Sequence, residues 1–323
     1  MALLALDKYR VTTPNSIVSP RAAWGLLLLV ILLWGVNWPV MKYGLQYIGP
    51  LTFVAARMVM GAAVMFLVAA VRGELRWPDR RDWPVVLSVG LIQMAGFMIL
   101  ITLALQFVPA GRSAILAYTT SLWVIPIAVL VLGERLDRLK TVGFVLGLAG
   151  VAVMFNPFGF DWTDQRVLIG NGLLLLAALL WAVLIVQIRG HRWHGSPLSL
   201  GPWQFAVGAL LAVPLAVWSE GWLAIRWSPA TAAVLIYNGP LATAFCFWAM
   251  VSVNRALPAI TTSLGTLGVP AVGVASALLG LGEQLTWTNG LGLLLIVGGL
   301  ACVSLADRPR SPATAPAAPK PKV

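Results

Sequence analysis

The residues able to contact a solute are a few polar and aromatic side chains embedded in long apolar runs. In hydrocarbon an unpaired amide or hydroxyl costs roughly several kcal/mol, so such side chains must face other helices. There they either hydrogen-bond between helices or line a cavity, where aromatic walls with sparse polar groups suit a small amphipathic solute. The candidates for substrate binding are Asn37, Trp38, Gln93, Tyr118, Trp181, Tyr237, Asn238 and Thr262.

The carboxylates all lie outside the middle of the apolar runs. Acidic residues within membrane helices are the usual relays for protons and cations. Their absence argues against an exchanger built on a membrane glutamate and favours a facilitator, or a coupling that the sequence does not display. Glu134 and Glu283 end two apolar runs, where we expect them to close turns, with gating as the alternative.

Two arginines interrupt the apolar runs, Arg57 and Arg112, both expected near the outer ends. They either extend to lipid headgroups and helix carbonyl ends, or form an outer vestibule that attracts carboxylates. Proline removes a helix hydrogen bond, so Pro39, Pro126 and Pro270 are the candidate hinges.

The sequence contains few of the residue patterns that are typical of an enzyme. His191 and His194 form a His-x-x-His pair without cysteine or carboxylate neighbours in sequence, which favours solvated side chains over a metal site. We find no phosphate loop, nucleophile elbow or dinucleotide fingerprint, which excludes ATP-driven transport on this chain and predicts no cofactor. A membrane enzyme would need an acid–base pair or a metal set within its spans.

The elements that must position these residues are membrane helices. Of the 323 residues, 59% are hydrophobic and 10% charged, against about 25% charged in soluble domains. This composition excludes a soluble enzyme, a disordered protein and a disulfide scaffold. The net charge of +11 would suggest nucleic acid in a soluble chain, but in a membrane chain it is the expected excess of basic residues on the cytoplasmic side.

Ten stretches are apolar enough for helices that cross about 30 Å of hydrocarbon. They cover approximately residues 22–41, 50–71, 84–105, 109–132, 139–156, 167–188, 200–218, 231–250, 258–281 and 287–306. With the N-terminus inside, 17 of the 22 basic residues lie in inner segments and three in outer loops. Both termini are therefore predicted to be cytoplasmic, with an N-terminal tail at 1–21 and a disordered tail at 307–323.

The sequence repeats internally. A shift of 147 places aligns Gly25-Leu26-Leu27-Leu28-Leu29 with 172–176, and a shift of 149 aligns Gly133-Glu134-Arg135-Leu136 with 282–285. The chain therefore divides into two five-helix halves, 22–156 and 167–306, joined by an outer loop at 157–166. Because five is odd, the second half enters the membrane from the opposite side. Such inverted repeats place a site near the midplane and give alternating access.

Three motifs stand out in the first half: Leu33-Trp34-Gly35-Val36-Asn37-Trp38-Pro39, the arginine of Phe53-Val54-Ala55-Ala56-Arg57, and Val108-Pro109-Ala110-Gly111-Arg112 followed by Leu132-Gly133-Glu134-Arg135-Leu136. They resemble motifs of the drug/metabolite transporter superfamily, EamA type. The resemblance covers about residues 22–306 and is closest to bacterial amino-acid exporters, including aromatic amino-acid exporters. It implies an all-α basket of ten helices, with the fifth and tenth outside a central cavity.

The sequence thus predicts a monomeric inner-membrane exporter or facilitator of amino acids and similar metabolites, including aromatic ones. Its partners would be the solute and the bilayer, without nucleic acid. A sugar-phosphate or nucleotide-sugar carrier would want several cavity lysines or arginines for phosphate, and only Arg57 and Arg112 are near. A multidrug exporter of the same superfamily is the other alternative.

Overall fold

The computed structural model describes residues 18–108, 110–134, 136–155, 163–221, 224–281 and 287–306. Within these ranges the chain is helical, and the single β feature is an isolated bridge between Ile48 and Ile225. The predictions for the two tails and for most of the 157–166 loop fall largely outside the described residues.

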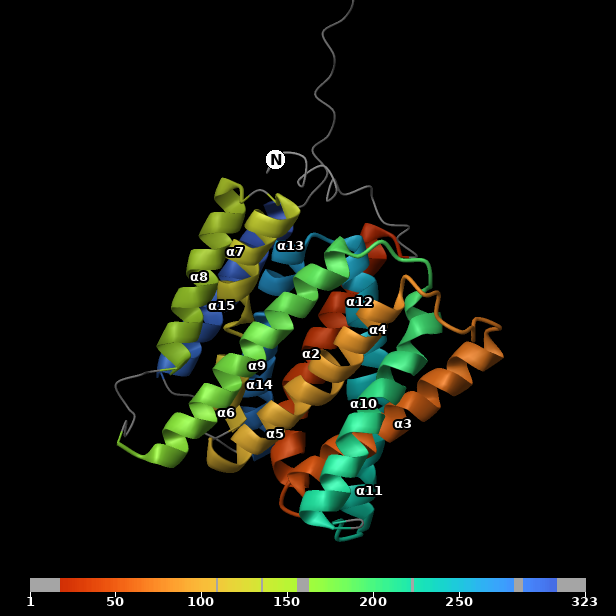
Figure 1. Cartoon of the computed structure of the whole chain (residues 1–323). Coiled ribbons are helices and arrows are strands. Elements are labelled where there is room, and N and C mark those ends of the chain that lie inside the picture. The colour runs from red at the N-terminus through yellow and green to blue at the C-terminus, as the bar shows by residue number, and fades with distance from the viewer. Residues whose placement is uncertain are drawn as a thin grey trace, which may run out of the picture.

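The helices form a bundle (Figure 1). In the first half they are α2 (Pro20–Gly44), α3 (Pro50–Val71), α4 (Trp83–Ser88), η2 (Val89–Phe97), α5 (Met98–Phe107), α6 (Ala110–Ala117), α7 (Thr120–Leu132) and α8 (Arg138–Phe155). In the second half they are α9 (Gln165–Gly190), α10 (Pro197–Glu220), α11 (Pro229–Ile236), η4 (Tyr237–Phe245), α12 (Cys246–Ala256), α13 (Ala259–Gly265), α14 (Gly268–Leu281) and α15 (Trp287–Ala306).

Six helical stretches of the described chain are long and apolar enough to cross a bilayer, and shorter apolar helices accompany them. The six are Pro20–Gly44, Pro50–Val71, Trp83–Phe107, Gln165–Gly190, Pro197–Glu220 and Pro229–Ala256. Large aliphatic side chains are exposed on their outer faces, Leu67 and Leu210 among them, as expected of a surface that meets lipid. The fold is that of a polytopic membrane protein.

Local sequence explains where several helices begin. The side chain of Ser19 accepts a hydrogen bond from Ala22 N at the start of α2, and Ser196 accepts one from Ser199 N at the start of α10. Each serine precedes a proline, which lacks the N–H that the first helical position would leave unpaired. At the C-terminal end of α7, Gly133 takes a left-handed conformation, with φ +66°, and the helix ends there.

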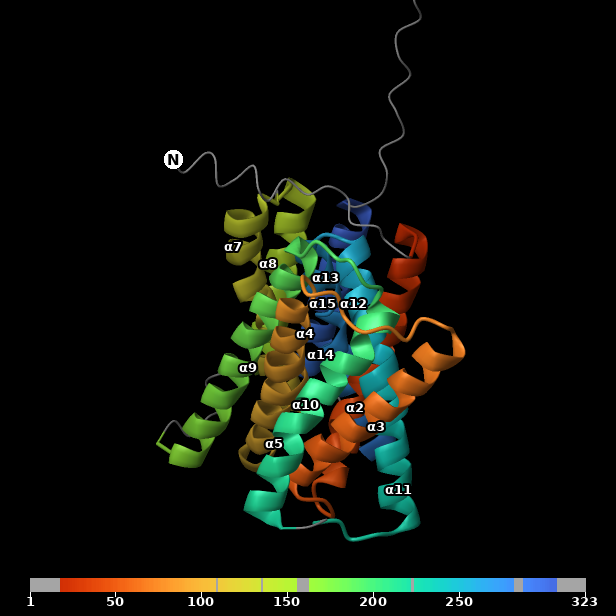
Figure 2. The ribbon, with the colours of Figure 1, turned by 45° about the vertical axis from the view of Figure 1, so that its right-hand side comes forward.

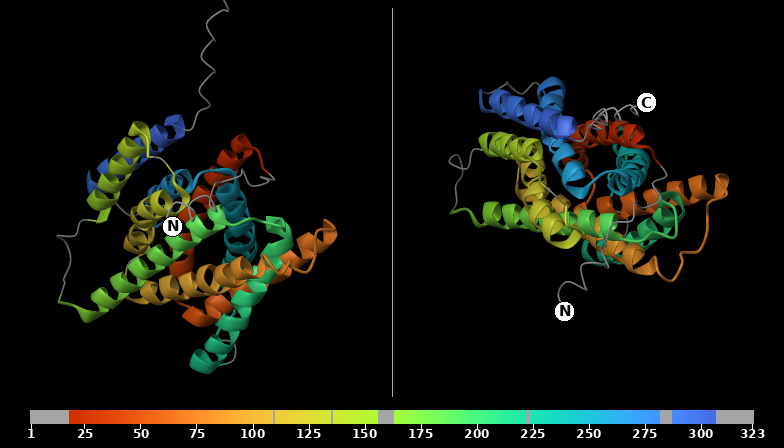
Figure 3. Two further views of the ribbon diagram at one scale, coloured as in Figure 1. Left: turned by 45° about the horizontal axis from the view of Figure 1, so that its top comes forward. Right: turned by 90° about the horizontal axis from the view of Figure 1, so that it is seen from above.

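Corresponding helices of the two halves pack against each other in matching pairs. Helix α3 packs along α10, while η2 packs against α10 and η4 against α3. Helix α8 packs along α15 at one side of the bundle (Figures 1 and 3). Gly143 permits that approach, because a Cβ there would lie 2.8 Å from Gly299 O. Gly147, one helical turn further along α8, also lies against Gly299, so this pair of glycines packs within the chain.

Two irregular features also recur at one spacing. The π-helical segments η2 and η4 each contain nine residues, and 148 positions separate them. Helices α6 and α7 are separated by a turn at Tyr118–Thr119, and α13 and α14 by a turn at Thr266–Leu267, again 148 positions apart. In η4, Pro240 lacks an N–H to donate, which accounts for part of the irregular bonding there.

The predicted hinges do not coincide with these breaks. Helix α2 continues through Pro39 to Gly44, and α7 continues through Pro126. Pro270 lies in the first turn of α14, where a proline costs no helix hydrogen bond. Neighbouring helices can tolerate a proline kink without a break, and the hinge role of the three prolines stays a prediction.

Candidate functional site

A cavity lies among α2, α3, η2, α5, α6, α7 and α9. Its volume is about 440 Å³ when the part open to solvent is included. The space that can hold the centre of a water molecule is much smaller, about 30 Å³. A bound solute larger than a few atoms would therefore have to move the walls apart. The lining consists of Trp34, Asn37, Trp38, Met41, Arg57, Phe97, Met98, Ile101, Ala117, Tyr118, Thr120 and Trp181.

Aromatic rings form most of one wall. The ring of Trp181 lies 4.5 Å from that of Phe97 and 5.5 Å from that of Trp34, measured between centroids. Trp34 also donates its indole N–H to Ala242 O at 2.9 Å, within the π-helical segment η4. This hydrogen bond joins α2 to η4. On the other side, Trp38 and Tyr118 make an edge contact at 6.5 Å.

Polar groups in the cavity are few. Asn37 is 5% exposed, and its Oδ1 has no hydrogen-bond partner among the described residues. Thr120 donates its hydroxyl to Ala117 O at 2.7 Å, across the turn between α6 and α7. Asn37 is therefore the lining amide with an acceptor still available to a solute.

Arg57 is the charged group of the lining, and it is 1% exposed. Its Nε donates to Thr243 Oγ1 at 2.9 Å, and its Nη1 contacts Met41 Sδ at 3.1 Å. The guanidinium carbon lies 5.7 Å from the centroid of the Phe53 ring. The expected extension of this side chain to lipid headgroups is thus wrong, because α3 turns it inward against α2 and η4.

The structure brings together four of the eight predicted binding residues: Asn37, Trp38, Tyr118 and Trp181 line the cavity. The other four do not belong to its lining. Tyr237 donates to Leu33 O at 2.7 Å, and the amide of Asn238 donates to Val234 O at 3.0 Å. Gln93 and Thr262 are buried between helices.

Sequence reasoning missed Trp34 and Met41, although a signal existed. Both lie on the helix face that carries Asn37 and Trp38, at spacings of three, four and seven residues. No comparable signal marked Phe97 or Ile101. Two further predictions concern groups that lie outside the described residues, namely the side chain of Arg112 and the whole of Glu283.

Two carboxylates hydrogen-bond to the starts of helices in the opposite half of the chain. The two oxygens of Glu134 accept from Ala259 N at 2.8 Å and Ile260 N at 3.1 Å, at the start of α13. Glu220 likewise accepts from Leu51 N and Thr52 N, both at 2.8 Å, at the start of α3. The predicted turn-closing role of Glu134 corresponds to these backbone hydrogen bonds, made to a helix of the other half.

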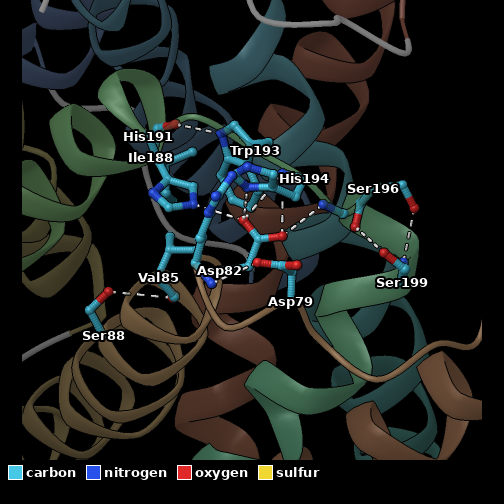
Figure 4. A network of polar contacts seen from close by, with 12 residues as sticks. Asp79, Asp82, Val85, Ser88, Ile188, His191, Trp193, His194, Ser196 and Ser199 are labelled. Carbon is cyan, nitrogen blue, oxygen red and sulfur yellow. Dashed lines mark hydrogen bonds and ion pairs between the residues drawn. The ribbon is translucent and has the colours of Figure 1, made fainter. Parts of the chain in front are cut away.

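A further polar cluster surrounds Asp82, which precedes α4 (Figure 4). In Figure 2 the start of α4 lies beside the loop between α9 and α10. The enclosed carboxylate accepts from His191 Nε2 at 2.9 Å and from Gly195 N at 2.7 Å, and His194 N lies 3.2 Å away. Burial by itself raises the pKa of Asp82, but the hydrogen bond from His191 and those from the His194 and Gly195 backbones outweigh it and hold the pKa below its usual value.

The histidine pair is thus not simply solvated. The side chain of His191 is 17% exposed and hydrogen-bonds to Asp82, while that of His194 is 38% exposed. Among the described residues, no group of three or more histidine, cysteine or acidic side chains is arranged to hold a metal ion. The cluster instead joins the start of α4 to the loop that precedes α10.

Comparison with solved structures supports the fold. The chain superposes on a solved crystal structure with a TM-score of 0.71 at 22% sequence identity, covering 89% of this chain and 98% of that one. Identity at this level shows the fold alone.

Comparison with sequences supports the family. The chain is 29% identical to "Uncharacterized transporter YoaV" of Bacillus subtilis over 85% of this chain and 94% of that protein. It is 29% identical to a "Probable amino-acid metabolite efflux pump" of Escherichia coli, over 85% and 92% respectively. A "Probable terminal-alkyne amino-acid exporter" of Streptantibioticus cattleyicolor is 24% identical over 81% and 86%.

The profile of the EamA-like transporter family matches the chain twice, over residues 22–156 and 168–305. These two segments cover nearly all of the described helices. Together with relatives named as transporters along almost their whole length, they show a membrane-embedded, multi-pass transporter and not an enzyme. The chain belongs to the EamA-like transporter family of the drug/metabolite transporter superfamily.

Proposed function

We propose that this protein moves amino acids and related small metabolites across the bacterial inner membrane, by alternating access to the cavity described above. The observation that carries the proposal is the position of the cavity: helices of the first half line most of it, and Trp181 of the second half completes its aromatic wall. A site between two halves is where rocking of one half against the other changes access.

An arrangement of ten spanning helices in two inverted repeats is part of the proposal. The recurring spacing of 148 between η2 and η4, and between the two helix breaks, supports it. The double match of the family profile supports it independently. Irregular backbone in membrane helices is tolerated where it lies inside the protein or beside a cavity, and the first of each pair adjoins the cavity at Phe97 and Tyr118.

Amino acids are the substrate class that the relatives favour, since two of those named above are described as handling amino acids or amino-acid metabolites. The cavity offers matching chemistry: aromatic walls for an apolar side chain, an unpaired amide acceptor in Asn37, and a cation in Arg57. A sugar-phosphate carrier would need several cations for its phosphate. Arg57 is the one cation among the described lining residues, which disfavours that alternative.

The orientation that we propose has both termini in the cytoplasm, as the distribution of basic residues indicates. The loop that contains Asp82 and the loop at 191–196 then lie on the cytoplasmic side. We further propose a monomer, because the Gly143 face is occupied by α15 of the same chain. Transport is downhill, since no acidic residue belongs to the described lining of the cavity.

The test is uptake of labelled amino acids into liposomes that contain the purified protein, with and without an imposed pH gradient. We expect saturable counterflow that a pH gradient does not accelerate. Asn37→Ala should lower it, whereas Trp218→Ala, at an 84% exposed site that does not belong to the lining, should leave it unchanged. Counterflow that is absent for every amino acid and related metabolite tested would contradict the proposal.

A further inference from the structure

The charge of the cavity is unbalanced. Arg57 is almost fully buried, and no carboxylate among the described residues lies within 4 Å of its guanidinium. A buried charge without a partner is costly, and proteins normally supply a counter-charge or several hydrogen bonds. Here the acceptors are a neutral hydroxyl, Thr243, and the weakly accepting sulfur of Met41.

The guanidinium also retains unused donors. Arginine carries five N–H groups in a planar fork. Two of them meet Thr243 Oγ1 and Met41 Sδ, so three meet no acceptor that the described residues provide. Because Arg57 belongs to the cavity lining, a ligand in the cavity can reach this edge of the fork. A carboxylate is the group that such a fork binds most strongly, through two parallel hydrogen bonds.

From this arrangement we infer that Arg57 binds the carboxylate of an amphipathic monoanion, and that the site prefers such an anion over a zwitterion or a cation of the same shape. A monoanion neutralises Arg57, whereas a zwitterion leaves one net positive charge in a site of low dielectric constant. The ammonium of a zwitterion also has no carboxylate to meet among the described lining residues, which offer it neutral acceptors such as Oδ1 of Asn37 and the hydroxyls of Tyr118 and Thr120.

The rest of the cavity selects the body of the solute. The rings of Trp34, Trp181 and Phe97 form a continuous aromatic wall, and Met41 and Met98 can adapt to different shapes. The solute class is therefore a carboxylic acid with an aromatic or bulky apolar group and no free amine, such as a deaminated or N-acylated amino acid. This inference rests on the proposed transport through the cavity and narrows its substrate class.

Three indole compounds of nearly equal shape test the inference: indole-3-acetate (charge −1), tryptophan (net charge 0) and tryptamine (charge +1). Equilibrium binding of each labelled compound to purified protein should follow that order, with indole-3-acetate at least about 10-fold tighter than tryptophan. Equal binding of all three, tightest binding of tryptamine, or binding of none would overturn the inference without any variant having to fold.

Variants then assign the preference to Arg57. Arg57→Gln should weaken binding of indole-3-acetate by about 10- to 100-fold and strengthen that of tryptamine, because the repelling charge is gone, and Arg57→Lys should restore part of the loss. Arg166→Gln removes the same charge from an exposed site and serves as the control. An equal loss for all three compounds in folded Arg57→Gln would show a structural role and overturn the inference.

Transport in liposomes separates this inference from the proposed function. If indole-3-acetate binds in a manner that depends on Arg57 but no carboxylic acid or amino acid crosses the bilayer, the anion site stands and the transport proposal fails. If zwitterionic amino acids cross equally well in the wild type and in Arg57→Gln, the transport proposal stands and the anion site fails.

Discussion

Glu134 offers the sharpest separation of a structural role from a gating role. Its carboxylate holds the first two free N–H groups of α13, at 2.8 and 3.1 Å, and so joins the end of α7 to a helix of the other half. Glu134→Gln keeps the shape of the side chain but removes its charge. One oxygen can still accept from a backbone N–H, whereas the new NH₂ group would face the second N–H and cannot accept from it.

The magnitude follows from these contacts. Loss of one hydrogen bond to a charged acceptor costs about 1.5–3 kcal/mol, because the abandoned donor stays largely enclosed. Loss of the negative charge at the positive end of a helix costs about 0.3–1 kcal/mol more. We therefore expect Glu134→Gln to lower the free energy of unfolding by about 2–4 kcal/mol.

The assay pairs thermal unfolding of the purified protein with counterflow in liposomes at equal protein content. Glu220→Gln is the matched control, since Glu220 makes two equivalent hydrogen bonds to the start of α3. A structural cap predicts lower unfolding temperatures for both variants and counterflow that is little changed at low temperature. Abolished counterflow with an unchanged unfolding temperature in Glu134→Gln alone would refute this reasoning and assign Glu134 to a gate.

Three further outcomes are expected. Asp82→Asn should lower the free energy of unfolding by about 1.5–3 kcal/mol. Because the pKa of Asp82 is lowered in the folded protein, the stability that its carboxylate contributes should persist from pH 8 to pH 5 and be lost only below about pH 4; melting curves recorded against pH would show this. Trp181→Ala should slow counterflow of phenylalanine more than that of threonine; an equal effect on both would place Trp181 in the scaffold. Gly143→Leu should cost about 1–3 kcal/mol through overpacking against Gly299, whereas Gly172→Leu, with nothing within 4 Å, should be neutral in unfolding measurements.

The helices could be predicted from the sequence, because hydrocarbon imposes length and apolarity on them. The helix breaks could not. The turn at Tyr118–Thr119 contains neither proline nor glycine, which are the usual signals of a helix break, whereas Pro126 lies inside a continuous helix. In a membrane bundle, packing by neighbouring helices decides whether a proline kinks or ends its helix.

The candidate site could be predicted in part, for a related reason. On α2 the polar and aromatic residues share one face, so Asn37 and Trp38 were found and Trp34 lay at helical spacing from them. Helix α3 is apolar all round, so no periodic pattern showed that Arg57 turns inward to Thr243. Its position seven residues into the helix suggested the outer surface, but the direction of a side chain depends on which helices pack around it.

The distribution of regular and irregular backbone indicates which parts move. Glu220 at the end of α10 caps the start of α3, and glycine contacts at Gly143 join α8 to α15. Sliding of either helix pair would break these contacts and cost free energy. By contrast, η2 ends at Phe97 and the α6–α7 turn begins at Tyr118, both on the cavity wall. Segments that already lack regular i to i+4 bonding can change shape with little further loss of hydrogen bonds. In the proposed transport, widening of the small cavity around a solute therefore falls on these segments, while the α3–α10 and α8–α15 pairs resist sliding of the two halves past each other.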